Sequence, residues 1–111
     1  MYTATFTFRK RRFDDDFDRL DAAIAQAAQA IPGYLGEQAW QSSDGERVST
    51  VYYWQSLEAL HALMHHPAHL EAKAAQSRWL AGYQVVVAEV LRVYGDEGFS
   101  PADGGCAQGR M

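Results

Sequence analysis

The residues best suited to chemistry gather between Tyr52 and Tyr83. This stretch holds all four histidines of the chain, two of its three tryptophans and three of its six tyrosines. Histidine titrates near neutral pH, so it is the side chain that most readily takes up or gives back a proton in catalysis. The candidate site is therefore expected within this stretch.

A helix from Pro67 to about Ala81, stopped by Gly82, explains the spacing in the second half of the stretch. Its inward side collects a histidine and a glutamine among apolar residues, namely His69, Ala72, Gln76, Trp79 and Leu80. Buried polar groups need partners, because leaving one unsatisfied costs about 1–3 kcal/mol. A ligand pocket and a hydrogen-bonded core explain His69 and Gln76 equally well.

The remaining histidines are weaker candidates. His61 and His65 are four residues apart, a spacing found in zinc sites, and Glu58 lies about one turn earlier. The buried side of this short helix is marked by other residues, namely Leu57, Leu60 and Met64. The two histidines then lie on its wetter flank, and no metal site is predicted.

The first third of the chain predicts a strand and a helix that support this stretch. Residues 2–8 alternate aromatic residues or alanine with threonine, which is the period of a β-strand. Asp14 to Asp16 supply a cap and favourable charge for a helix, whose apolar residues recur at helical spacing as far as Ile31. Pro32-Gly33 ends that helix.

A hairpin is predicted next. Asp44-Gly45 favours a two-residue type I′ turn between strand-like runs at 34–43 and 46–54. In this register Trp40 lies opposite Ser49 and shares a face of the sheet with Tyr53. Tyr52 and Trp54 then point to the other face.

The last elements are a broken helix and a strand. Ser56 is a natural N-cap, and Pro67 divides the helix that follows, with His66 as junction or second N-cap. Residues 83–94 are rich in valine and apolar on both faces at their start, which predicts a central or interface strand. Residues 96–111 lack periodicity and predict a flexible tail, which contains the single cysteine, Cys106.

The element order is typical of the α+β ferredoxin-like fold, β-α-β-β-α-β, with a four-stranded antiparallel sheet and helices on one face. Residues 1–95 form one domain in this interpretation. The helix-free face has to be covered, so we expect a homodimer that packs sheet against sheet. The cavity would lie between the sheet and the helices.

Composition excludes several classes of partner. The net charge is −4, and the basic run Arg9 to Arg12 is followed at once by Asp14 to Asp16, so no nucleic-acid footprint is predicted. No apolar run of about 18 residues exists, and the first residues lack the apolar core of a signal peptide. We therefore expect a cytoplasmic protein without a membrane span.

Three segments resemble the antibiotic biosynthesis monooxygenase (ABM) domain family over about residues 2–96. They are Pro32-Gly33-Tyr34-Leu35-Gly36, Tyr53-Trp54-Gln55-Ser56-Leu57-Glu58-Ala59 and His66-Pro67-Ala68-His69-Leu70 before Trp79. The resemblance implies a dimeric α/β barrel. It also implies cofactor-free oxygenation of quinol-like aromatics or haem degradation. The alternative is a binding protein without turnover, whose pocket holds a small aromatic, a lipid fragment or haem.

For cofactor-free oxygenation of a small aromatic with O₂, His69 is the candidate base. The expected substrate-binding residues are Trp40, Tyr53, Trp54, Gln76, Trp79 and Tyr83. Characterised members of both enzymatic branches use an asparagine on the early strands, and this chain contains none. That absence favours ligand binding without turnover. Alignment with haem degraders places Lys73 where they have their iron-ligating histidine, and His69 lies one turn earlier.

Overall fold

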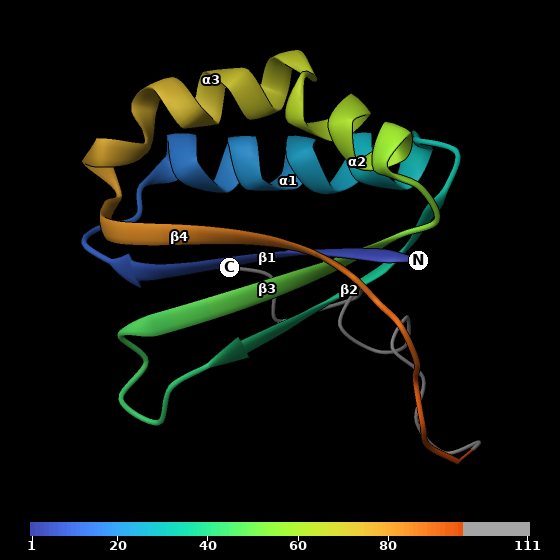
Figure 1. Cartoon of the computed structure of the whole chain (residues 1–111). Coiled ribbons are helices and arrows are strands. Elements are labelled where there is room, and N and C mark those ends of the chain that lie inside the picture. Colours follow the sequence, from blue (N-terminus) through green and yellow to red (C-terminus); the bar gives the residue numbers. More distant parts are fainter. Residues whose placement is uncertain (97–111) are drawn as a thin grey trace.

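The computed structural model describes residues 1–96 and consists of a sheet with helices on one face (Figure 1). The elements in chain order are β1 (Tyr2–Lys10), α1 (Asp15–Ala30), β2 (Tyr34–Gln41), β3 (Arg47–Trp54), α2 (Leu57–Met64), α3 (Pro67–Ala75), a 3₁₀ turn (Gln76–Arg78) and β4 (Leu80–Glu89). The four strands are antiparallel in the order β2-β3-β1-β4. This confirms the ferredoxin-like fold. Apart from residue 96, the expected tail and Cys106 lie outside the described residues.

The first helix begins and ends as predicted. Asp14 is its N-cap, and the carboxylate accepts a hydrogen bond from the backbone N–H of Phe17 at 2.9 Å. After the helix, Gly33 adopts a φ of 99°, which favours glycine. A Cβ atom on Gly33 would lie 2.9 Å from the Cβ of Ala59, so glycine also lets this turn pack closely against α2.

The hairpin has the predicted register but a different turn. Trp40 pairs with Ser49, as expected. However, a type I′ turn needs positive φ at both central residues, and Gly45 has it whereas Asp44 does not. The Asp44 carboxylate instead accepts hydrogen bonds from the Ser42 hydroxyl at 2.6 Å and the Glu46 N–H at 3.0 Å. These local bonds stabilise a longer loop between β2 and β3, so the two-residue turn was wrong.

The break at Pro67 is confirmed. Ser56 caps α2 by accepting from the N–H of Ala59 at 3.1 Å, and Nδ1 of His66 caps α3 by accepting from the N–H of Ala68 at 3.1 Å. These two caps make α2 and α3 independent helices.

The predicted end of the second helix was wrong. The α-helix stops at Ala75, and Gly82 lies inside β4 instead of capping a helix. The cause is tertiary, because the carbonyl of Trp79 accepts hydrogen bonds from Arg11 (2.8 Å) and Arg12 (3.2 Å) after β1. A single 3₁₀ turn joins the helix to the strand and keeps Trp79 facing inward.

The fourth strand is an edge strand. It runs from Leu80 to Glu89 and pairs with β1 alone. A central position for the strand predicted over residues 83–94 was therefore wrong, as were its bounds, whereas an interface position stays a prediction. Its valines, Val85 to Val87, are each nearly half exposed in the single chain. Within the single chain, valine enrichment therefore reflects β-propensity and does not mark burial on both faces.

Apolar side chains fill the layer between the sheet and the helices in two clusters. One gathers Phe8, Phe17, Leu20, Val48, Trp79 and Leu80, and the other gathers Ile24, Ala28, Trp54, Ala59, Leu60 and Leu63. Among the helices of residues 1–96, none has the length and apolar character needed to cross a membrane.

Candidate functional site

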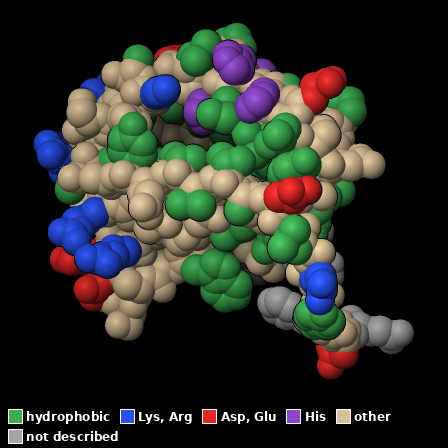
Figure 2. All heavy atoms as spheres, in the orientation of Figure 1, with side chains coloured by type: hydrophobic (Ala, Val, Ile, Leu, Met, Phe, Trp, Pro, Cys, Tyr) green, Lys and Arg blue, Asp and Glu red, His purple; other side chains and the backbone are tan. Residues whose placement is uncertain are grey.

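A cavity of about 570 Å³ lies between the sheet and the helices. Figure 2 shows the surface hollowed between α3 and β4, beside the histidine side chains. Five of the predicted site residues line this cavity: His69, Trp54, Gln76, Trp79 and Tyr83. The rest of the wall is mostly apolar and includes Ala4, Phe6, Leu20, Ile24, Leu60, Leu63, Val85 and Val87. The volume suits a small aromatic ligand.

Two predicted site residues lie elsewhere. Trp40 and Tyr53 are on the helix-free face of the sheet and do not line the cavity. Strand alternation is the reason, since Trp54 faces the helices and its neighbour Tyr53 must face away. The hydroxyl of Tyr53 donates a hydrogen bond to Oε1 of Gln38 at 3.1 Å, and burial raises the pKa of Tyr53. Placing these two residues in the cavity wall was wrong.

His69 combines a half-buried position with a buried ring nitrogen. Its Nδ1 makes no hydrogen bond of acceptable geometry within residues 1–96. Burial lowers the pKa of His69 from its ordinary 6.5, and the positive charge of Lys73 lowers this pKa further. The carbonyl of Met64 opposes the shift, while His65 and His66 add to it weakly. The imidazole is therefore neutral at pH 7 and able to accept a proton.

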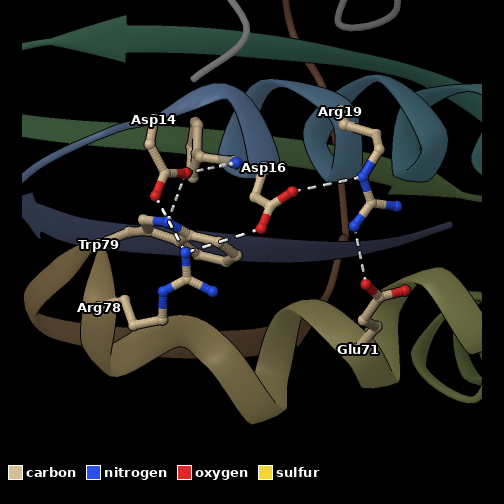
Figure 3. A network of polar contacts seen from close by, with 7 residues as sticks. Asp14, Asp16, Arg19, Glu71, Arg78 and Trp79 are labelled. Carbon is tan, nitrogen blue, oxygen red and sulfur yellow. Dashed lines mark hydrogen bonds and ion pairs between the residues drawn. The ribbon is translucent and has the colours of Figure 1, made fainter.

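Trp79, which follows the 3₁₀ turn after α3, is fixed by an aspartate (Figure 3). Oδ1 of Asp14 accepts hydrogen bonds from Nε1 of Trp79 and from the N–H of Phe17, both at 2.9 Å. Oδ2 accepts one from the Arg78 guanidinium at 3.0 Å. The ring of Trp79 also meets Phe17 edge-on at 5.5 Å. One carboxylate thus joins the start of α1 to the wall of the cavity.

The other tryptophan of the wall is held from β2. The ring of Tyr34 meets Trp54 edge-on at 5.6 Å, and the Tyr34 hydroxyl donates to Oε1 of the fully buried Glu37 at 3.0 Å. Tyr52, which lies two residues earlier on β3, stacks on Trp54 with ring centroids 6.4 Å apart. These contacts fix the plane of an indole that lines the cavity.

Sequence reasoning treated Asp14 only as a helix cap, compared Lys73 only with the iron ligand of haem degraders, and assigned no role to Asp21 or Gln84. Lys73, Asp21 and Gln84 all line the cavity. The sequence could have placed Lys73 in the cavity wall, because residues four apart lie on the same face of a helix and Lys73 follows His69 by four. No local signal ties Asp14 to Trp79, which lies 65 residues away.

Loss of the Asp14 carboxylate should loosen both α1 and Trp79. We expect Asp14→Ala to lower the melting temperature by roughly 4–8 °C, since it removes an N-cap. It should also change the near-ultraviolet circular dichroism of the indole. Asp15→Ala is the matched control, because Asp15 makes none of the contacts of Asp14. Equal melting temperatures for the two variants would contradict the role of Asp14.

The Asp14 carboxylate also makes the stability of the fold depend on pH. The hydrogen bond from Phe17 holds the pKa of Asp14 below its ordinary 3.8, and bonds from Trp79 and Arg78 add to this effect. Because the folded-state pKa is lowered, the stabilisation is complete above the ordinary value and is lost as the pH falls through the folded-state pKa. Acid titration of the melting temperature should show a smaller loss in Asp14→Asn than in the unaltered chain.

His61 of α2 and His65, the C-cap of that helix, do not line the cavity. Nδ1 of His65 lies 2.8 Å from the carbonyl oxygen of His61, and the two rings are perpendicular with centroids 6.5 Å apart. Across residues 1–96, no three His, Cys, Asp or Glu side chains are grouped closely enough to hold a metal ion.

Comparison with known proteins shows which family this chain belongs to. The family described as monooxygenase af470-like matches residues 7–88, which is most of the chain. The chain belongs to this family. The match confirms the resemblance to ABM domains and supports a monooxygenase-like function. The uncharacterized protein YqjZ of Bacillus subtilis is 33% identical to this af470-like domain over 92 residues, covering 82% of this chain and 80% of YqjZ.

Solved structures share the fold of the af470-like domain. SnoaB of Streptomyces nogalater, described as a cofactor-independent oxygenase, is 14% identical with a TM-score of 0.70, covering 86% of this chain and 97% of SnoaB. A Deinococcus radiodurans protein, described as a candidate antibiotic biosynthesis monooxygenase, is 17% identical with a TM-score of 0.70 and covers 88% and 100% of the two chains. At these identities the likeness establishes the fold alone.

Proposed function

We propose that this protein is a cofactor-independent monooxygenase that oxidises a small, electron-rich phenol or quinol with O₂. The observation that carries the proposal is the half-buried imidazole of His69 in the wall of a largely apolar cavity of about 570 Å³, where burial lowers the pKa of the ring. A base in a water-poor cavity can ionise a phenol, and the resulting anion is a strong enough reductant to act on O₂. The likeness in fold to SnoaB supports this reading.

The reaction balances without a cofactor. His69 removes the proton that ionises the substrate, and the anion gives one electron to O₂. The two radicals join through a new C–O bond, and the peroxide takes the proton back from the imidazolium. Loss of water from the hydroperoxide leaves a carbonyl, so the phenol O–H and a ring C–H ortho or para to it react with O₂ to give two C=O groups and H₂O. The substrate supplies all four electrons.

The other cavity residues bind and orient the substrate. Trp54 and Trp79 offer aromatic faces held in place by Tyr34 and Asp14, which restricts a bound ring to few orientations. Gln76 and the Tyr83 hydroxyl line the same space and can hydrogen-bond to substrate oxygens. In this proposal they position the ring, while His69 moves the proton.

Oxygen uptake tests the proposal directly. The unaltered protein should consume O₂ when supplied with members of a panel of hydroquinones and flavonoid-like phenols. Product mass should rise by the replacement of two hydrogens with one oxygen. A protein that binds these compounds without consuming O₂ would instead be a ligand-binding member of the fold.

We also propose a homodimer formed through the helix-free face of the sheet. This face is covered by no element of residues 1–96, and it carries Trp40, which is 57% exposed, and Val86, which is 46% exposed. Burying such a face would stabilise a pair of chains. Light scattering should give a mass twice that of one chain, and Val86→Asp should shift it towards a single chain. A monomeric mass for the unaltered protein would contradict the dimer.

Haem binding is the alternative with the least support from the side chains present. Within residues 1–96, His69 is the one imidazole in the cavity wall, and Lys73 stands one turn further along the helix. A lysine ammonium has no lone pair with which to bind iron. A haem titration decides this alternative, because a shift of the Soret band would show binding and its absence would remove haem degradation.

A further inference from the structure

Lys73 shares the cavity wall with His69. The two residues are four apart on α3, and both side chains line the cavity. The charge of Lys73 acts on the His69 imidazole, and the side chain makes no ion pair with any other residue of 1–96. By contrast, Arg19 of α1 is paired with Glu71 at 2.9 Å, and Arg78 of the 3₁₀ turn is paired with Asp14 at 3.0 Å. Lys73 is thus an available cation at the edge of an apolar space.

Polar residues of three other elements also line the cavity. They are Asp21 of α1, Tyr52 of β3, and Tyr83 and Gln84 of β4. Asp21 carries the one carboxylate in the wall among residues 1–96. Like charges repel, so an anion bound at Lys73 would keep its negative oxygen near α3 and away from the Asp21 carboxylate. Its apolar part would then lie against the apolar residues of the sheet.

We propose that Lys73 binds the negatively charged oxygen of the ligand, and that the substrates are aromatic compounds with an ionisable phenol or enol whose ring fills the apolar interior. This inference deepens the proposed function by assigning the group that stabilises the anion formed when His69 takes the proton. A lysine in this place favours the ionised substrate over the neutral one. Lys73 is then a residue that determines substrate class.

The test uses a ligand that reports its own ionisation and is too electron-poor to be oxidised. 4-Nitrophenol absorbs visible light as the phenolate, so a spectrum of the bound compound gives the ratio of the two forms. The unaltered protein should bind the phenolate about tenfold more tightly than Lys73→Met does. Lys73→Arg should retain the preference. 4-Nitroanisole, which cannot ionise, should bind equally to all three proteins.

Lys10→Met is the matched control for net charge. Lys10 lies over the Phe13 ring at 4.7 Å and does not line the cavity. It should leave the binding of 4-nitrophenol unchanged, whereas added salt should weaken phenolate binding to the unaltered protein.

Two results would overturn the proposal. One is a preference for the phenolate that persists in Lys73→Met or is lost equally in Lys10→Met. The other is that neither nitro compound binds to the unaltered protein. The proposed monooxygenase activity fails separately, since absent oxygen uptake with quinols leaves the phenolate preference intact. Turnover without that preference would refute only the role of Lys73.

Discussion

Replacing His69 by alanine is expected to lower kcat/KM for oxygen uptake by roughly 10²–10⁴-fold. The reason is that the variant has no neutral imidazole in the cavity wall to ionise the substrate. The affinity for a substrate that is already ionised should change much less. The measurement is oxygen consumption across substrate concentrations, with binding followed separately by tryptophan fluorescence.

His61→Ala is the control for this experiment. His61 is exposed on α2 and does not line the cavity, so its loss should leave oxygen uptake unchanged. If the unaltered protein and His69→Ala turn over at the same rate, His69 is not the base.

The rate should also depend on pH with a known sign. Burial and Lys73 lower the pKa of His69 below 6.5, so the base form persists to lower pH than in a free histidine. The rate should stay level near neutral pH and fall as the pH drops through the lowered pKa. Lys73→Met should move that midpoint upward. The same shift costs stability in acid, because below pH 6.5 the unfolded chain takes up a proton that the folded chain refuses.

Leu60→Ala is expected to lower the free energy of unfolding by about 2–5 kcal/mol. Leu60 is 2% exposed and packs with Ile24, Trp54 and Leu63 beneath α2. Truncation removes buried methyl groups beside an existing cavity. Neighbouring side chains therefore cannot move in to fill the added space and recover the lost contacts. A small domain has roughly 5–15 kcal/mol of stability in total, so the loss should be large in urea denaturation.

Leu70→Ala provides the same chemical change at the surface. Leu70 lies on α3 and is 48% exposed, so its truncation should change stability by less than about 0.5 kcal/mol. Similar losses for the two variants would show that the layer between sheet and helices is not the source of stability described here.

Sequence reasoning succeeded where the determinants are local. The caps at Asp14, Ser56 and His66 depend on a side chain and a backbone N–H two or three residues away. The hairpin register follows from strand alternation, which also identifies the residues that face the helices. Helical spacing correctly placed His69 and Gln76 on the inward side.

It failed where distant parts of the chain decide the outcome. The end of α3 depends on hydrogen bonds between Trp79 and the residues after β1. The exposed position of β4 depends on which strand it pairs with. Trp40 and Tyr53 were assigned to the cavity because of residue type, although the alternation that placed Trp54 inside excludes Tyr53 from the same face.

The strand order has a consequence for how the chain folds. β1 pairs only with β3 and β4, and Asp14 binds groups that lie 64 and 65 residues further along the chain. The N-terminal quarter therefore stays incomplete until the last strand has been synthesised. Such distant pairings slow folding relative to helical bundles of the same size. A chain that ends before residue 80 should leave the edge of β1 open, and it should self-associate instead of forming a smaller stable domain.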